Sequence, residues 1–164
     1  MIKIGVVSDT HIHTLREGAK LVDRLLAGCF SQVDMIFHAG DLVNPALLDL
    51  FSDLPVHAVR GNMDPPTCDL PSKKIIEVGT FRIGLMHGWG HPTTLEERLQ
   101  HEFRKDEIDC LVYGHSHYPV CYVNVAGMLI FYPGSVTDRR SAPQHTVGVL
   151  EIDQSISGRI IAVD

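Results

Sequence analysis

The feature that most restricts the fold of this chain is a series of short β-branched apolar runs separated by segments of helical periodicity. The first run covers residues 2–8, and two more cover 33–40 and 55–61. Apolar residues recur at helical spacing over 15–29, and a short helix is expected over 44–51. Strands and helices that alternate in this way form right-handed crossovers and a parallel sheet.

The pattern changes after a proline-rich loop and becomes richer in β-structure. Two strands are expected over 73–79 and 81–88, followed by a helix over 93–105. Thr94 and Glu97 match the spacing of a capping box, so we expect this helix to begin at Thr94. Further strands are predicted over five segments, the last four of them in antiparallel pairs: 109–114, 119–127, 128–134, 145–153 and 158–164. We therefore expect one α/β domain over 1–164 with two β-sheets.

Composition excludes several classes of protein. The net charge is −6 and the sequence has no basic run, which argues against strong binding to nucleic acid. We see no apolar segment long enough to span a membrane and no signal peptide at the N-terminus, so we expect a cytoplasmic protein. The ten histidines are the first indication of chemistry, because histidine is the commonest metal ligand and acid–base residue.

Polar side chains with metal-binding potential follow five of the predicted strands, usually beside a glycine. In α/β sheets, ligands bind beyond the carboxyl ends of the strands, so these side chains can converge in one cleft. Each has an ordinary alternative as a turn former, a helix cap or a hydrogen-bonded histidine. Five such coincidences at one edge are improbable, and we interpret the set as metal ligands: Asp9, His11, Asp41, Asn62, His87, His115 and His117.

Seven ligands exceed the needs of one tetrahedral ion, which takes about four. We therefore expect two divalent ions, with the Asp41 carboxylate bridging them. The nitrogen and oxygen ligands suit manganese, our preferred assignment, or iron, zinc, nickel or cobalt. Two such ions can activate water near neutral pH and hold the attacking and leaving oxygens of a displacement at phosphorus.

The ordered motifs D-x-H, G-D, G-N-x-D, H-G and G-H-x-H resemble those of the calcineurin-like metallophosphoesterases. The resemblance runs from residue 1 to about 152. It is closest to their small capless branch, which includes bacterial and archaeal phosphodiesterases and the retromer scaffold subunit. It implies two mixed β-sheets packed face to face and flanked by helices.

The resemblance also implies how the ligands are divided between the two metals. One ion would be held by Asp9, His11, Asp41 and His117. The other would be held by Asp41, Asn62, His87 and His115. We expect a metal-dependent phosphoric ester hydrolase, in which a metal-bridged hydroxide attacks the phosphorus of a small phosphodiester.

One residue departs from the pattern of many relatives, which carry a histidine where this chain has Met63. Methionine cannot protonate a leaving group. We therefore expect a preference for acidic leaving groups and consider His91 as a substitute for the missing histidine. Asp64 is a second candidate, which would orient the Asn62 loop, although it could equally cap a turn.

Two other functions stay open at this point. A phosphoesterase fold can be a non-catalytic interaction scaffold, although scaffolds of this kind should have lost ligands and this chain has all seven. A nuclease should have a basic groove or a capping domain, and neither is evident. The open cleft would also suit a homo-oligomer in which a neighbouring subunit completes the site.

Overall fold

The first of two β-sheets is built from both ends of the chain. The computed structural model describes residues 1–51 and 53–164. In this sheet the strand order is β10-β9-β1-β2-β3. The first three strands of the chain are parallel to one another, and β9 is antiparallel to β1. The bounds are β1 Ile2–Val7, β2 Met35–His38, β3 Val56–Ala58, β9 Thr146–Ile152 and β10 Ile156–Ala162.

The second sheet is formed by the middle of the chain, in the order β4-β5-β6-β8-β7. Its three central strands are parallel and its two outer pairs are antiparallel. The bounds are β4 Lys73–Val78, β5 Phe81–Met86, β6 Cys110–Tyr113, β7 Val120–Val123 and β8 Leu129–Tyr132. The predicted antiparallel pairs in the C-terminal third are confirmed, but β8 also pairs with β6 in parallel.

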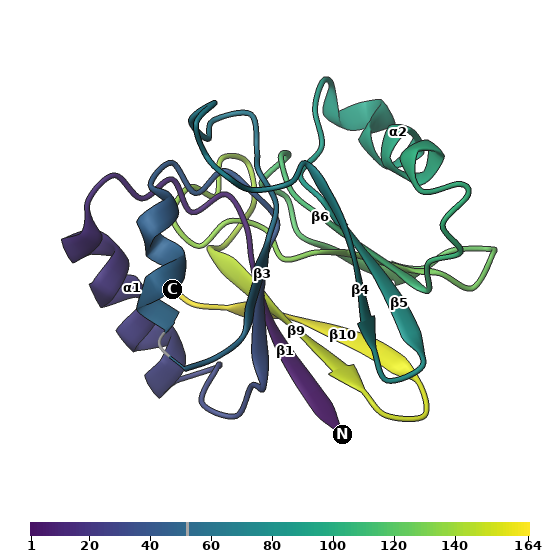
Figure 1. Ribbon diagram of the computed structural model, residues 1–164, viewed down its shortest axis with the longest axis horizontal. Coiled ribbons are helices and arrows are strands. Elements are labelled where there is room, and N and C mark those ends of the chain that lie inside the picture. Colours follow the sequence, from purple (N-terminus) through teal and green to yellow (C-terminus); the bar gives the residue numbers. More distant parts are fainter. Residues whose placement is uncertain (52) are drawn as a thin grey trace.

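The two sheets pack face to face, with helices on their outer faces (Figure 1). The buried layer between them contains residues such as Phe37 and Phe131. On the first sheet lie α1, Leu15–Ala27, and the 3₁₀ helix η1, Pro45–Phe51. On the second lies α2, Leu95–Glu102, which the 3₁₀ helix η2, Pro92–Thr94, directly precedes. The expectation of two mixed sheets flanked by helices is confirmed. Within the described residues, none of the helices is long and apolar enough to cross a membrane.

The predicted capping box at Thr94 is wrong. A 3₁₀ turn begins at Pro92, so Thr94 lies inside a helical segment, and its hydroxyl accepts a hydrogen bond from Arg98 instead of capping α2. A capping box is found at the start of α1, where the Thr14 hydroxyl accepts from the Glu17 amide and the Glu17 carboxylate accepts from the Thr14 amide.

Candidate metal centre

The loops that follow β1, β2, β3, β5 and β6 bring all seven predicted ligands together at one end of the two sheets. His87 Nε2 lies 3.2 Å from Asp41 Oδ2 and 3.0 Å from Asn62 Oδ1. The Asn62 oxygen is also 3.3 Å from His115 Nδ1. On the other side, His11 Nε2 is 3.4 Å from His117 Nε2 and 3.8 Å from Asp41 Oδ2.

Two sets of three side chains have ligand atoms that all lie within 4.8 Å of one another. One set is Asp9, His11 and His117, and the other is Asp9, Asp41 and His87. Asp9 therefore belongs to both sets. Asp41 also lies between the two sides, because its Oδ2 faces His11 as well as His87.

Each of the two carboxylates is held by one oxygen and offers the other to the centre. Asp9 Oδ2 accepts hydrogen bonds from the Ser8 hydroxyl at 2.7 Å, the Tyr132 hydroxyl at 2.6 Å and the His115 amide at 3.1 Å. Asp9 Oδ1 is buried and has no hydrogen-bond partner within the described residues. Asp41 Oδ1 accepts from the Met63 amide at 2.8 Å. A buried carboxylate oxygen without a partner is costly unless a cation binds it.

Three histidines are oriented by backbone carbonyl groups. His87 Nδ1 lies 2.7 Å from the Ala39 carbonyl oxygen, and His117 Nδ1 contacts the Asp138 carbonyl oxygen. His115 Nε2 lies 3.0 Å from the Gly90 carbonyl oxygen. Because a carbonyl only accepts hydrogen bonds, each of these nitrogens carries the proton. When the ring is neutral, its opposite nitrogen presents a lone pair to the centre, as metal-binding histidines do.

The electrostatics of the centre favour positive charge. Burial opposes ionisation of Asp9 and Asp41, yet the neighbouring imidazole rings, His117 beside Asp9 and His87 beside Asp41, hold both pKa values below the usual range. Burial also disfavours a charged His87, but the Asp41 and Asp9 carboxylates outweigh it and raise the pKa of His87. The pKa of His11 is lowered by its burial, which keeps this ring neutral and able to bind a metal.

The backbone is strained at the ligands. Five of the seven predicted ligands have a positive φ, a conformation that side chains other than glycine rarely adopt: Asp9, His11, Asp41, His115 and His117. Such strain persists where the surrounding structure imposes it, and it is concentrated at functional sites.

The glycine before His115 is required for close approach. A Cβ atom at Gly114 would collide with the Ser8 hydroxyl and lie 2.8 Å from His87 Nδ1. Only glycine therefore lets the end of β6 approach the end of β1. The two histidines that follow face different partners, because His115 approaches Asn62 and His117 approaches Asp9.

The two other predicted site residues lie differently. Asp64 is buried and ties two loops together, since its carboxylate accepts from the amides of Gly61 at 2.7 Å, Val43 at 2.8 Å and Asp41 at 3.0 Å. His91 is exposed, and its Nδ1 accepts from the Thr93 amide at the start of η2. Within the described residues, no hydrogen bond or ion pair joins His91 to the seven ligands.

Several residues that support the ligands carried no clear signal in the sequence. Tyr132 is fully buried and links Asp9 to the His117 amide. The Ser135 hydroxyl donates to the Asp9 carbonyl at 2.8 Å. His38 lies 3.0 Å from the Thr10 hydroxyl and accepts from the Gly40 amide, and burial lowers its pKa to about 3. Sequence reasoning offered only weak indications, the position of His38 directly before the G-D motif and that of Ser135 in a Tyr-Pro-Gly-Ser segment.

The donor set fits divalent metal ions. Three features indicate a site that stabilises a cation. They are the Asp9 oxygen without a hydrogen-bond partner, the lone pairs that three neutral histidines direct inward, and the raised pKa of His87. Carboxylate oxygens and imidazole nitrogens without thiolates suit manganese, iron, zinc, nickel or cobalt, whereas calcium prefers more oxygen ligands.

Comparison with known proteins supports the same chemistry. The chain is 36% identical over 152 residues to a probable metallophosphoesterase of Methanothermobacter thermautotrophicus, covering 92% of this chain and 86% of that protein. It is 25% identical to a phosphodiesterase of Methanocaldococcus jannaschii, over 93% and 95% of the two chains. The crystal structure of Vps29 from Entamoeba histolytica in complex with Zn²⁺ superposes with a TM-score of 0.70 at 25% identity, over 98% and 99% of the chains.

A calcineurin-like phosphoesterase superfamily domain is matched over residues 2–155, which is nearly the whole chain. This match agrees with the motifs that end the strands and with the two mixed sheets. The chain therefore belongs to the calcineurin-like phosphoesterase superfamily, within which its relatives include metallophosphoesterases and a phosphodiesterase.

Proposed function

We propose that this protein is a dinuclear metal-dependent phosphodiesterase that hydrolyses small phosphodiesters. The observation that carries the proposal is the convergence of the partnerless Asp9 oxygen with the inward lone pairs of the histidines. We assign Asp9, His11, Asp41 and His117 to one ion, and Asp41, Asn62, His87 and His115 to the other. The position of Asp41 Oδ2, which faces His11 and His87, supports Asp41 as the shared ligand.

Two divalent ions, when bound, supply a water molecule of lowered pKa and offset the charge of the phosphate oxygens. The side chains of this chain hold the reacting groups in place. Asp9 and Asp41 stay ionised and fixed, because each has one oxygen in hydrogen bonds. Asn62 is exposed and His115 is partly exposed, so both lie on the open side that a substrate approaches. Asp64 is a positioning residue, since its carboxylate accepts hydrogen bonds from the backbone amides of Asp41 and Gly61.

The leaving group decides which diesters are good substrates. The Met63 side chain is 56% exposed beside the centre, and its thioether has no proton to give. We therefore propose a preference for leaving groups that depart as stable anions. His91 is the candidate proton donor for poorer leaving groups. It donates as an imidazolium, which requires its Nδ1 to release the Thr93 amide and take up a proton.

A non-catalytic scaffold is the second candidate, favoured by the similarity to Vps29. That comparison structure binds zinc, so metal binding alone does not separate an enzyme from a scaffold. Turnover does, and the full set of ligands in this chain favours the enzyme.

The test is an assay of the protein purified without chelator, after its metal content has been measured and manganese has been added. The substrates are p-nitrophenyl phosphate, bis-p-nitrophenyl phosphate, a cyclic nucleotide and single-stranded DNA. We expect the aryl diester to be hydrolysed fastest. Binding of two metal equivalents without turnover of any substrate would support the scaffold, and rapid cleavage of DNA would support a nuclease.

A further inference from the structure

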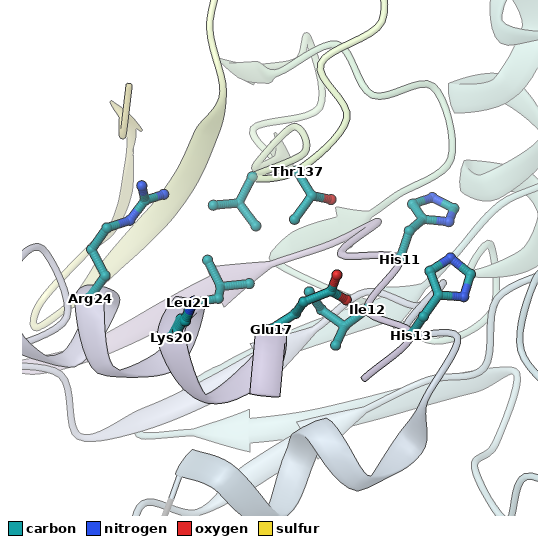
Figure 2. A pocket seen from close by; sticks show the side chains of 9 residues that line it. His11, Ile12, His13, Glu17, Lys20, Leu21, Arg24 and Thr137 are labelled. Carbon is teal, nitrogen blue, oxygen red and sulfur yellow. The ribbon is translucent and has the colours of Figure 1, made fainter. Parts of the chain in front are cut away.

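A groove of about 490 Å³ begins at the metal centre and runs along α1. His11 lines this groove and is also one of the seven ligand candidates, so the groove adjoins the metal centre. Figure 2 shows His11 and His13 at one end of the groove, Arg24 at the other, and Glu17 and Leu21 between them. A molecule whose phosphate lies at the metal centre can extend along α1 toward Arg24.

The groove combines an apolar floor with charged walls. Ile12 and Val136 are buried, and Leu21 is partly buried beside them. On the helix wall, Lys20 and Arg24 lie about one and two turns beyond Glu17, because an α-helix has 3.6 residues per turn. An organic group can therefore pack on the floor while its far end meets cations.

The charge of the groove is opposite to that of the whole chain. The protein carries −6, whereas the groove has two cations and one carboxylate. The carboxylate of Glu17 is already engaged with the Thr14 amide in the capping box. Over residues 1–51 and 53–164, neither Lys20 nor Arg24 forms an ion pair. Two cations without an ion pair, in a groove that adjoins the metal centre of an acidic protein, indicate an anionic ligand.

We propose that this groove binds the arm of the substrate that is not cleaved, and that this arm carries a second anionic group, which Lys20 and Arg24 recognise. The inference rests on the proposed function and narrows its substrate class to phosphodiesters with a nucleoside-sized arm that ends in a phosphate or carboxylate. The apolar floor contacts the middle of the arm.

A matched pair of substrates tests the proposal. One is the p-nitrophenyl ester of thymidine 5′-phosphate, and the other is the same ester with a 3′-phosphate. In both, the oxygen of water forms a bond to phosphorus and the bond from phosphorus to the aryl oxygen breaks. The products are p-nitrophenolate, a released proton and thymidine 5′-phosphate or thymidine 3′,5′-bisphosphate. We expect kcat/KM to be about tenfold higher for the 3′-phosphorylated ester, the combined value of two exposed ion pairs.

The variants Lys20→Glu and Arg24→Glu should each lower this preference, and the double variant should bring the ratio of the two kcat/KM values to about one. Arg16→Glu is the matched control, because Arg16 is an exposed cation on the same helix but does not line the groove. This control should keep the preference. A ratio of one in the unmodified protein, or a preference that survives in the double variant, would overturn the inference.

A binding measurement separates this inference from the proposed function. Calorimetry with thymidine 3′,5′-bisphosphate and thymidine 5′-phosphate needs no turnover, and the bisphosphate should bind about tenfold more tightly. If the difference in affinity between the two ligands disappears in the double variant while no ester is hydrolysed, the groove is an anion-binding site and the proposed enzymatic function is wrong. If both esters are hydrolysed alike and both ligands bind equally, the enzyme stands and the groove assignment fails.

Discussion

The metal centre has two unlike sides, a buried floor and an open rim. The floor consists of four residues that are at most 2% exposed: Asp9, Asp41, His87 and His117. Each floor residue has at least one further hydrogen bond that fixes its orientation. The rim consists of His11, Asn62, Met63 and His115, which are partly or fully exposed. The floor is thus determined by the fold, while the rim is available to a substrate.

This difference predicts that substitutions in the floor and in the rim have different effects. Burying charged carboxylates costs free energy, which is offset only if their hydrogen bonds and the bound cation are all in place. Changes to the floor should therefore affect metal binding, stability and activity together. Changes to the rim should alter the choice of substrate and leave the floor intact.

The strongest test of the floor is Asp41→Asn. The amide oxygen can still accept from the Met63 amide, so the fold is retained, but the negative charge between His11 and His87 is lost. We expect activity to fall by about a thousandfold or more. Substitution of a residue that only hydrogen-bonds to a metal ligand already lowers metal affinity or activity by about 10- to 100-fold. Calorimetric titration with manganese should show weaker binding of both ions.

Asp49→Asn is the control for this experiment, since Asp49 is an exposed carboxylate on η1. Turnover and two-site binding that persist in Asp41→Asn would show that Asp41 is not the shared ligand. Because Asp9 belongs to both geometric sets, Asp9→Asn should then be the variant that weakens both sites.

The next largest effect is expected for Asp64, which supports the floor from behind. Asp64→Ala leaves the amides of Gly61, Asp41 and Val43 without their acceptor. We expect the free energy of unfolding to fall by about 2 to 3 kcal/mol, because hydrogen bonds to a charged group are worth more than neutral ones. Urea denaturation measures it, with the exposed Asp69→Ala as a control. Equal stability of the two variants would mean that Asp64 does not hold these loops.

The sequence was sufficient to predict the ligands that follow the strands, but not the groups that hold these ligands in place by hydrogen bonds. The ligand-bearing loops follow β-branched runs whose pattern is local, so the residues that converge could be named. The capping box was assigned to the wrong helix because Thr14-x-x-Glu17 and Thr94-x-x-Glu97 both match the motif. Pro92 starts a 3₁₀ turn that places Thr94 inside the helical segment, and this depends on three-dimensional context.

The supports escaped prediction for a physical reason. The acceptors that orient the histidines are backbone carbonyls, at Ala39, Gly90 and Asp138, and a carbonyl group has no sequence signature. Tyr132 contacts Asp9 across 123 residues, which only the packing of the two sheets can establish. The need for glycine at position 114 likewise depends on this packing, because a side chain there would collide with Ser8.

The pH dependence of the free energy of unfolding tests the environment behind the floor. His38 lies beneath it, and burial lowers its pKa to about 3. Between that value and the ordinary pKa of about 6.5, the unfolded chain binds a proton that the folded chain does not, so stability falls as the pH falls. When the pH is lowered from 7 to 5, the free energy of unfolding of the metal-free protein should fall by about 2 kcal/mol more than that of the His38→Gln variant.

Urea denaturation of both proteins at the two pH values provides this comparison. Glutamine can still donate to the Thr10 hydroxyl that His38 contacts, so the fold is preserved. Other groups that titrate in this range contribute to both proteins alike and cancel in the difference. An identical pH dependence of the two proteins would show that His38 is protonated in the folded state.

The smallest effect is expected on the rim, at Met63. Its amide holds Asp41, but its side chain is exposed, so Met63→His should place an imidazole beside the centre without disturbing the floor. An alkyl leaving group needs a proton and an aryl leaving group does not. We therefore expect the variant to raise kcat for an alkyl phosphodiester by about tenfold, a fraction of what an optimised general acid contributes, with less change for the aryl ester.

Met63→Leu is the matched control, since leucine has no proton to donate. The gain in Met63→His should also decline at a pH where the imidazole loses its proton. An equal gain with both leaving groups would instead indicate a change in substrate binding. A loss of manganese affinity in Met63→His would show that the rim and the floor are coupled, which would break the separation between the two sides of the centre.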